Sequence, residues 1–422
     1  MHRSTIRLAA VLIAATLAIA ACGDDSQDAT AGADAVPPAS DTTAPAGPPV
    51  SGEPVVIGFV NSEGGAFSVP EMRVGSEVAE SVVNEQLGGI GGRPLEIVRC
   101  ATDGSPESSI DCANQLVEEG VVAVHLGTDL GSDALVPVLD DAGIPIIGHV
   151  QLGIAGMFDE NSFYLGSAAL AYGAAALQFY SDLGAETITW FFPDVPTSRV
   201  FTDTVLTPAA TAMGIEYKSV YYDAASPNFP VLAATAASET PDVSGALAAT
   251  DGQCAELISA LRGAGYQGHI LAASCVGLYD AVGDDAIGVH TDSDHWNPGD
   301  IESAPAAKQE DLELYAAAMR AADEEDLVEG NAVISFADTI NIARILSTIE
   351  GAIDGSTVAA ALRATTDFDA FAGPTITCDH TVIAGNSACA ASILFYEVQV
   401  DGSIRAVTED FLDVAAALAP AG

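Results

Sequence analysis

The sequence predicts an α/β protein made of two lobes, each built around a doubly wound, largely parallel β-sheet. From Val55 onward, short apolar runs typical of buried strands alternate with segments whose apolar residues have helical spacing. The alternation restarts after about residue 165, and the roughly 365 residues that follow the N-terminal region are enough for two medium-sized domains. Such alternation favours parallel sheets with right-handed crossovers.

The first half of the pattern runs to about residue 147. Its expected strands span residues 55–60, 95–100, 121–126 and 144–147, and its expected helices span residues 70–87, 105–119 and 132–141. Residues 88–92, four of which are glycine, lie between an expected helix and an expected strand. A phosphate-binding loop needs the opposite order, in which a strand leads through glycines into a helix. The glycines therefore predict a turn.

The second half repeats the same alternation. Its expected helices span residues 168–183, 200–213, 227–237 and 254–264, and its expected strands span residues 187–192, 216–221, 245–249 and 269–272. Residues 276–311 are polar and predict an irregular segment. Helices are expected at residues 311–323, 331–349 and 356–363, and strands at 392–400 and 404–408.

The N-terminus has the pattern of an export signal. Arg3 and Arg7 precede an apolar run over residues 8–21, which ends in small residues directly before Cys22. This pattern predicts a lipoprotein signal peptide over residues 1–21 and lipidation of Cys22; the alternative is an ordinary secretory signal with an incidental cysteine. Residues 22–53 are rich in Asp, Ser, Thr, Ala, Gly and Pro and predict a disordered tether. No later run predicts a second membrane segment.

Charge and cysteine content narrow the class of protein. The formal net charge of −46 argues against binding of nucleic acid or of an anionic membrane surface. Apart from Cys22 the chain has six cysteines, which allow 15 pairings. We expect the three local disulfides, because each would close a short loop between adjacent elements in an exported protein. The alternative is a metal site, but the sequence has no CxxC pair. The expected pairs are Cys100 with Cys112, Cys254 with Cys275, and Cys378 with Cys389.

No sequence motif points to catalysis. The chain has no nucleophile elbow, HExxH or Walker pattern. His290, Asp292, Asp294 and His295 form a polar cluster that could bind a cation, but they fall in the segment expected to be irregular. We interpret them as a solvated surface loop. The sequence therefore predicts no catalytic residue, no metal and no cofactor.

Several segments, in order and spacing, resemble the branched-chain amino acid (Leu/Ile/Val) type of periplasmic binding protein. The resemblance covers most of residues 54 to 410. The segments are residues 55–60, 83–85, 88–98, 142–147, 182–185 followed by 193–194, 362–365, and 369 with 371–374.

The resemblance implies a Venus-flytrap fold of two Rossmann-like lobes joined by a three-crossing hinge, with residues 54–167 plus 278–376 in lobe 1 and residues 168–277 plus 377–416 in lobe 2. Ligand closes such a hinge, and an ABC transporter permease reads the closed form. The expected protein is an extracytoplasmic, lipid-anchored monomer whose partners are a small-molecule solute, the permease and the membrane. Cys100 and Cys112 stand where such proteins often carry a first-lobe disulfide. The same fold also serves ligand-sensing receptor subunits, which remain the alternative. A hydrolase would need a paired acid and base, and no such pair is visible.

The resemblance also places the expected ligand contacts in loops that follow strands. In relatives, the loop after the third strand receives a ligand carboxylate, Thr197 stands about where an aromatic residue is common, and Ser274 stands near an acid that holds the α-ammonium. No clear glutamate occupies that ammonium position, and an inward Asp129 would repel a carboxylate. Asp129 or Asp251 could instead hold an amine or hydroxyl, so the expected solute is a small polar organic compound, such as an amino acid or amide; polyamines, short peptides and aromatic acids stay open. The candidates are Phe67, Ser68, Thr128, Asp129, Gly131, Ser132, His149, Val150 and Gln151 in the first lobe, and Thr197, Asp251 and Ser274 in the second.

Overall fold

The computed structural model describes residues 47–65, 68–223, 226–247 and 250–418. Residues Pro45–Gly422 form one compact unit, separate from Met1–Ala44, and the structure described below is that of the larger unit. The predicted signal peptide, Cys22 and most of the predicted tether lie outside the described residues, as does Phe67. Among the described residues, no helix has the length and apolar character needed to cross a bilayer.

The first lobe is built around a six-stranded, parallel sheet with the strand order β13-β5-β4-β3-β1-β2. Its strands are β1 (Val55–Ser62), β2 (Leu95–Thr102), β3 (Val124–Leu126), β4 (Ile146–Gly148), β5 (Ser162–Ser167) and β13 (Ala388–Ala390). The helices between them are α1 (Glu71–Glu85), α2 (Pro106–Glu119), α3 (Ser132–Asp141) and α4 (Ile154–Phe158).

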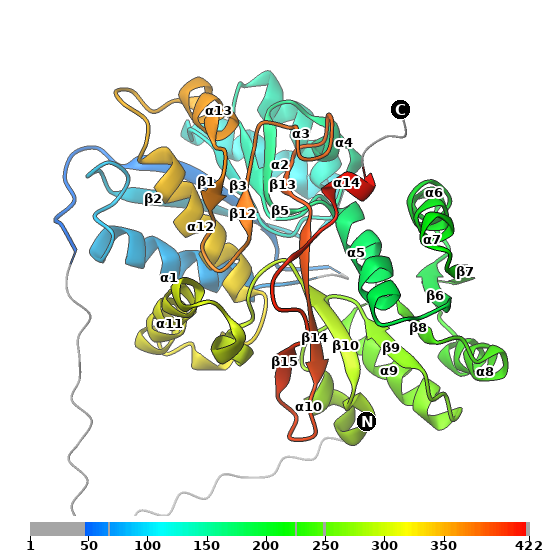
Figure 1. Cartoon of the computed structure of the whole chain (residues 1–422). Coiled ribbons are helices and arrows are strands. Elements are labelled where there is room, and N and C mark those ends of the chain that lie inside the picture. The colour runs from blue at the N-terminus through cyan, green and yellow to red at the C-terminus, as the bar shows by residue number, and fades with distance from the viewer. Residues whose placement is uncertain (1–46, 66–67, 224–225, 248–249, 419–422) are drawn as a thin grey trace, which may run out of the picture. The chain divides into compact units, whose positions relative to one another are not determined.

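Three later helices complete the first lobe, although they follow the second lobe in the chain. They are α11 (Ala306–Ala321), α12 (Ala332–Leu346) and α13 (Gly355–Ala364). Helices α1 and α12 pack side by side (Figure 1). Gly75 permits this contact, because a Cβ at that position would meet the Ala332 carbonyl. A short hairpin of β11 (Phe368–Asp369) and β12 (Thr375–Ile376) follows α13.

The second lobe contains a sheet with the order β15-β14-β10-β9-β8-β6-β7, and β16 pairs with β14. Strands β6 to β10 are parallel, and β14 is antiparallel to β10. The strands are β6 (Thr187–Pro193), β7 (Glu216–Tyr222), β8 (Val243–Ala246), β9 (His269–Ala272), β10 (Val289–Ser293), β14 (Ser392–Val398), β15 (Ile404–Ala406) and β16 (Leu412–Asp413).

Helices cover this second sheet. Those expected at residues 168–183, 200–213, 227–237 and 254–264 have counterparts in the structure, whereas the short helices Leu278–Val282 and Ala415–Leu418 were not expected. A π-helical turn at Thr202–Leu206 joins α6 to α7, in a region where the sequence predicts one uninterrupted helix. The Thr250 side chain starts α9 with a reciprocal capping box, which satisfies two backbone donors. The helices are α5 (Ala169–Asp182), α6 (Pro196–Phe201), α7 (Thr207–Met213), α8 (Phe229–Glu239), α9 (Asp251–Gly263), α10 (Leu278–Val282) and α14 (Ala415–Leu418).

The chain passes between the two sheets three times, which confirms the three-crossing hinge. The first crossing leaves β5 for α5, the second leaves β10 for α11, and the third joins β13 to β14 through Ala391. Strand pairing therefore assigns residues 289–293 to the second lobe and residues 388–390 to the first. The boundaries predicted at 277/278 and 376/377 disagree with this pairing, because they place residues 289–293 in the first lobe and residues 388–390 in the second.

The prediction of an irregular, solvated segment around His290 is also wrong. Strand β10 lies inside the second sheet, and His290, Thr291 and Asp292 are buried. Its polar side chains have partners in the interior: His290 Nδ1 lies 3.1 Å from the Tyr180 hydroxyl, and Thr291 Oγ1 donates to the Cys275 carbonyl at 3.0 Å. Side-chain polarity misled the prediction because buried polar groups can be satisfied by hydrogen bonds.

The three predicted local disulfides are confirmed. Cys100 on β2 bonds Cys112 on α2, with 5.6 Å between Cα atoms. The other two pairs are Cys254 with Cys275 and Cys378 with Cys389. Each bond joins elements that are neighbours in the fold.

Candidate functional site

The polar residues selected from the sequence lie where parallel strands end. In the first lobe Thr128 follows β3 and His149 follows β4; in the second lobe Asp251 follows β8 and Ser274 follows β9. The carboxyl ends of parallel strands share one edge of a sheet, and open α/β sheets bind ligands at that edge. Thr197 lies in α6, which follows β6.

Asp129 is an internal anchor of the first-lobe edge. Its side chain is buried, and Oδ1 accepts hydrogen bonds from Thr102 Oγ1 at 3.0 Å and from the Gly131 amide at 3.2 Å. Oδ2 accepts a hydrogen bond from Ser109 Oγ at 2.7 Å. The carboxylate therefore ties β2, α2 and the start of α3 together, and its oxygens are committed to groups within the lobe.

Gln151 has a similar internal role. Its buried side chain donates from Nε2 to Asn386 Oδ1 at 2.8 Å, and its Oε1 accepts from the Ala169 amide at 3.3 Å. These bonds join the loop after β4 to the loop before β13 and to the first residue of α5. The neighbouring Val150 is half-buried.

Other first-lobe candidates keep more freedom. Ser68 is exposed, and Thr128 is half-buried with its hydroxyl 3.3 Å from Met72 Sδ. A thioether sulfur is a weak acceptor, so this hydroxyl can exchange partners at small cost. Ser132 is buried at the first position of α3, after Gly131.

In the second lobe, Asp251 and Ser274 are exposed. Asp251 Oδ1 accepts a hydrogen bond from the Val276 amide at 3.0 Å. Ser274 has a left-handed backbone with φ of 57°, and its amide and hydroxyl donate to Asp292 Oδ1 at 2.7 and 3.0 Å. The structure thus places Ser274 against a buried carboxylate that the sequence analysis assigned to a surface loop.

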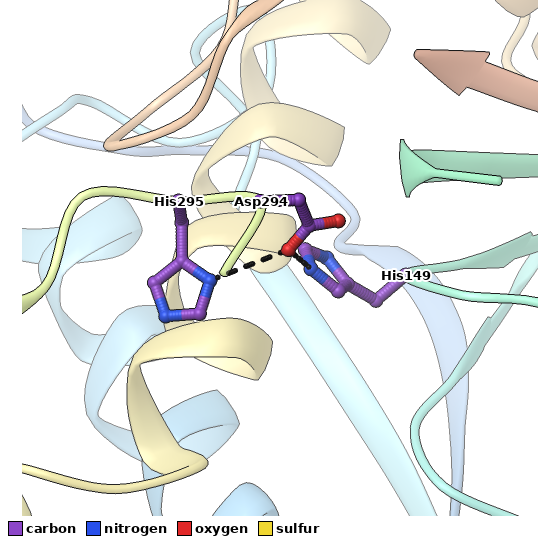
Figure 2. Close-up of side chains that lie close together, drawn as sticks. All are labelled: His149, Asp294 and His295. Atoms are coloured by element: carbon purple, nitrogen blue, oxygen red, sulfur yellow. Dashed lines mark hydrogen bonds and ion pairs between the residues drawn. The ribbon is translucent and has the colours of Figure 1, made fainter. Parts of the chain in front are cut away.

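His149 belongs to a group that we call the hinge cluster, made of the buried Asp294 and Asp338 and the half-buried His149 and His295. His149 Nε2 lies 2.9 Å from Asp294 Oδ1, and His149 Nδ1 lies 3.2 Å from Asp338 Oδ1. His295 Nδ1 lies 3.4 Å from the same Asp294 oxygen (Figure 2). The cluster joins the end of β4, the second crossing and helix α12.

The hydrogen bonds of His149 indicate the charge of its ring. Both ring nitrogens face carboxylate oxygens, and a neutral imidazole has only one N–H to donate. Burial opposes the charged ring, but the carboxylates of Asp294 and Asp338 outweigh it and raise the pKa of His149 well above its usual value. Burial also opposes ionisation of Asp294 and Asp338, yet His149 holds the pKa of both carboxyls below the usual range. His149 is therefore an imidazolium between two carboxylates.

Asp292 lies only two residues before Asp294, but its pKa is raised whereas that of Asp294 is lowered. Burial raises its pKa to about 7, against the effect of the hydrogen bonds from Ser274. Its Oδ2 is buried and has no hydrogen-bond partner among the described residues. A carboxyl group in this setting is easier to keep protonated than ionised.

Hydrogen bonds through Ser167 connect all three crossings. Its amide donates to Asp294 Oδ2 at 2.7 Å, which joins the first crossing to the second. Its hydroxyl donates to the Ser392 carbonyl at 2.8 Å and accepts from the Ser392 amide at 2.9 Å, which joins the first crossing to the third. The hinge cluster is therefore linked by hydrogen bonds to all three crossings between the lobes.

His149 is among the ligand contacts expected from the sequence, whereas Asp338, Ser167 and Ser392 are not. Asp338 had a usable signal, because it is the only charged residue between Ala332 and Ala343 in an otherwise apolar and neutral helical segment. An acidic residue that helical spacing directs into a core needs a partner. Ser167 and Ser392 offer no comparable local signal.

Comparisons with known proteins agree with this architecture. The sequence model of the periplasmic binding protein family matches residues 54–398. No curated protein sequence matches the chain.

Solved structures share the fold at low sequence identity. A possible leucine/isoleucine/valine-binding protein from Rhodopirellula baltica SH 1 is 17% identical with a TM-score of 0.68, over 86% of this chain and 98% of that one. An ABC transporter substrate-binding protein from Aeropyrum pernix is 16% identical with a TM-score of 0.72, over 88% and 100%. A fatty acid ABC transporter substrate-binding protein from Thermomonospora curvata is 15% identical with a TM-score of 0.71, over 88% and 95%.

With two parallel-sheet lobes, three crossings and a family match over most of its length, this chain belongs to the periplasmic binding protein family and has the two-lobe type I fold of that family.

Proposed function

We propose that this protein is a lipid-anchored, extracytoplasmic solute-binding protein that captures a small polar organic solute between its lobes and delivers it to an ABC importer. The observation that carries the proposal is the pair of sheets, one parallel and one largely parallel, joined by three crossings, with polar side chains at the carboxyl ends of their parallel strands. The structural neighbours named as ABC transporter substrate-binding proteins support the same use.

Within this proposal seven of the twelve candidate residues have one of two roles. Ser68, Thr128, Ser132 and Val150 from the first lobe, with Asp251 from the second, contact the solute. Asp129 and Gln151 hold the loops that carry the first group, because their polar atoms are hydrogen-bonded within the body of the protein. Phe67 and Thr197 remain proposed contacts on the strength of their places in the sequence.

The proposed protein is attached to the membrane by its N-terminus and works as a monomer. Cys22 carries the lipid, the acidic tether spans the distance to the membrane, and the protein acts as a monomer that meets its permease through the closed form. We assign it no catalytic step.

A thermal-shift screen of the purified protein tests the proposal. The library contains amino acids, amides, polyamines, short peptides, and aromatic and fatty acids. A ligand at about 100 times its dissociation constant adds roughly 2.7 kcal/mol to the free energy of unfolding, which gives a clear rise in melting temperature. We expect stabilisation by one chemical class, and no turnover of the bound compound.

A pair of threonine variants shows whether a hit binds at the proposed edge. Thr128→Val should weaken the response, because it removes a hydroxyl at the end of β3. Thr235→Val on α8 is the control, because the Thr235 hydroxyl bonds only the Val231 carbonyl of its own helix. Stabilisation that Thr128→Val leaves unchanged would contradict the assigned edge, and a screen without any hit would argue against solute capture.

A further inference from the structure

We propose that His149, Asp294 and His295 form a binding site for one divalent transition-metal ion, with Zn²⁺ the best-fitting ion. The three side chains each offer one ligand atom, and these atoms lie within 4.8 Å of one another. They come from two places in the chain, the end of β4 and the residues directly after β10, and they converge on one point (Figure 2).

The spacing of the donor atoms fits a tetrahedral ion. Zinc bonds to nitrogen and carboxylate oxygen of about 2.0–2.2 Å place neighbouring ligand atoms about 3.3 Å apart. Asp294 Oδ1 lies 2.9 Å from His149 Nε2 and 3.4 Å from His295 Nδ1. The third pair, His149 Nε2 and His295 Nδ1, lies within 4.8 Å. His295 Nδ1 also lies 3.0 Å from Ser293 Oγ, so binding of an ion requires this ring to turn from Ser293 toward the common centre.

Asp338 supplies the support that a metal-bound histidine requires. A histidine that binds metal through one nitrogen nearly always donates its other N–H to a carboxylate or carbonyl. His149 Nδ1 lies 3.2 Å from Asp338 Oδ1, so Nδ1 keeps its hydrogen and Nε2 is left to bind the ion.

The buried carboxylates of Asp294 and Asp338 have no permanently charged cationic partner among the described residues. In the described part of the chain, every salt bridge to Asp294 or Asp338 comes from a histidine, which is charged only when protonated. Asp338 is 1% exposed, and no described residue donates a hydrogen bond to its Oδ2. This oxygen forms a salt bridge with His125 Nε2 at 3.6 Å. A divalent ion offsets this excess of buried negative charge.

A small cavity beside the three residues leaves room for a fourth ligand. It has a volume of about 10 Å³ and is lined by the whole hinge cluster together with apolar residues. That space suits about one water molecule. Three protein ligands and one water make a common zinc arrangement, and the two imidazoles favour zinc over magnesium or calcium, which prefer oxygen ligands.

The site has a structural consequence because of its position. His149 ends a strand of the first lobe, whereas Asp294 and His295 begin the second crossing. A metal bond between them holds this crossing against the first lobe and thereby favours one arrangement of the hinge.

Calorimetric titration of the EDTA-treated and dialysed protein with ZnCl₂ tests the proposal. We expect one zinc ion per chain with micromolar or tighter affinity, little heat with MgCl₂, and visible absorption from a tetrahedral complex when CoCl₂ is used. His295→Ala is the informative variant, because His295 is partly exposed and its loss leaves the His149 contacts with both carboxylates in place. It should weaken zinc binding at least tenfold.

His269→Gln is the matched control, because His269 is exposed on β9 and stacks on His290, away from the hinge cluster. It should bind zinc as the unaltered protein does. Asp338→Asn should also weaken binding, by roughly 10- to 100-fold, through loss of the supporting carboxylate. Absence of zinc binding, equal affinity in His295→Ala, or an equal loss in His269→Gln would each overturn the proposal.

Discussion

Asp294 and Asp292 are buried carboxyl groups two residues apart, and we predict that replacement by asparagine destabilises the protein at Asp294 but not at Asp292. Asp294 accepts a hydrogen bond from the Ser167 amide at 2.7 Å and faces His149 Nε2 at 2.9 Å. In Asp294→Asn the amide NH₂ must point at one of these two donors. The His149 imidazolium also loses one of its two counter-charges.

The expected cost of Asp294→Asn is about 3–5 kcal/mol, the range for removing one partner of a buried ion pair. Asp292→Asn should instead be neutral or stabilising near pH 7. Asn Oδ1 can still accept both hydrogen bonds from Ser274, and the new NH₂ replaces an oxygen that has no partner. The amide also avoids the ionisation of a buried carboxyl group.

The pH dependence of Asp292 has a definite sign. Its pKa rises from the usual 3.8 to about 7 in the folded protein, so the folded state holds this proton more tightly than the unfolded state. Its stabilising contribution is complete below pH 3.8 and is lost as the pH rises through 7. At about 1.4 kcal/mol for each pKa unit, the stability difference should shift by up to about 4 kcal/mol in favour of Asp292→Asn between pH 4 and 7.5.

Urea unfolding of the unaltered protein and both variants, in EDTA so that no metal contributes, measures these differences. A large loss in Asp294→Asn together with an unchanged or higher stability in Asp292→Asn would support the assigned charge states. Equal losses in the two variants, or a change below about 1 kcal/mol in Asp294→Asn, would refute the reasoning about the imidazolium.

Three further predictions concern separate parts of the protein. Burial lowers the pKa of His290 to about 4, so stability should fall by on the order of 3 kcal/mol as the pH drops from 6.5 to 4, and urea unfolding of His290→Gln should show a smaller fall. Replacing Cys100 and Cys112 together by serine should cost about 3 kcal/mol by the loop-entropy model, and treatment with a reductant should then lower the midpoint of unfolding less than in the unaltered protein. Gly166→Ala should cost about 1–3 kcal/mol, because its Cβ would lie 2.5 Å from a hinge-cluster carboxylate, whereas Gly252→Ala, with open space around it, should be neutral in the same unfolding assay.

Local periodicity was sufficient to predict much of the α/β architecture. The expected strand at residues 269–272 is β9, and the expected helix at residues 168–183 contains α5. These elements have apolar patterns several residues long, and burial on a sheet or against a helix face requires such patterns. Short cysteine spacings likewise predicted the disulfides, because a bond between neighbouring elements constrains a short loop.

Elements whose placement depends on distant contacts were missed. Strand β10 combines His290, Thr291 and Asp292 in a polar run, and its burial depends on partners such as Tyr180, 110 residues earlier in the chain. Strand β13 has three residues and is defined by its pairing with β5. No local pattern distinguishes such segments from loops, so the predicted lobe boundaries were displaced.

The hinge cluster illustrates the same limit at the level of chemistry. His149 and Asp294 are 145 residues apart, and Asp338 is 189 residues from His149. The sequence indicated that polar side chains follow the strands, but it gave no indication which would be committed to internal hydrogen bonds. Asp129 and Gln151 were selected for the solute and form internal bonds, which only the three-dimensional arrangement of the loops reveals.

Small-angle X-ray scattering with and without a solute found by the thermal-shift screen tests the central claim most directly. Capture of a solute between two hinged lobes predicts a smaller radius of gyration in the saturated protein, with compaction that follows the binding curve and saturates at one solute per chain. Saturable binding without any change in the radius of gyration would contradict capture by closure of the hinge.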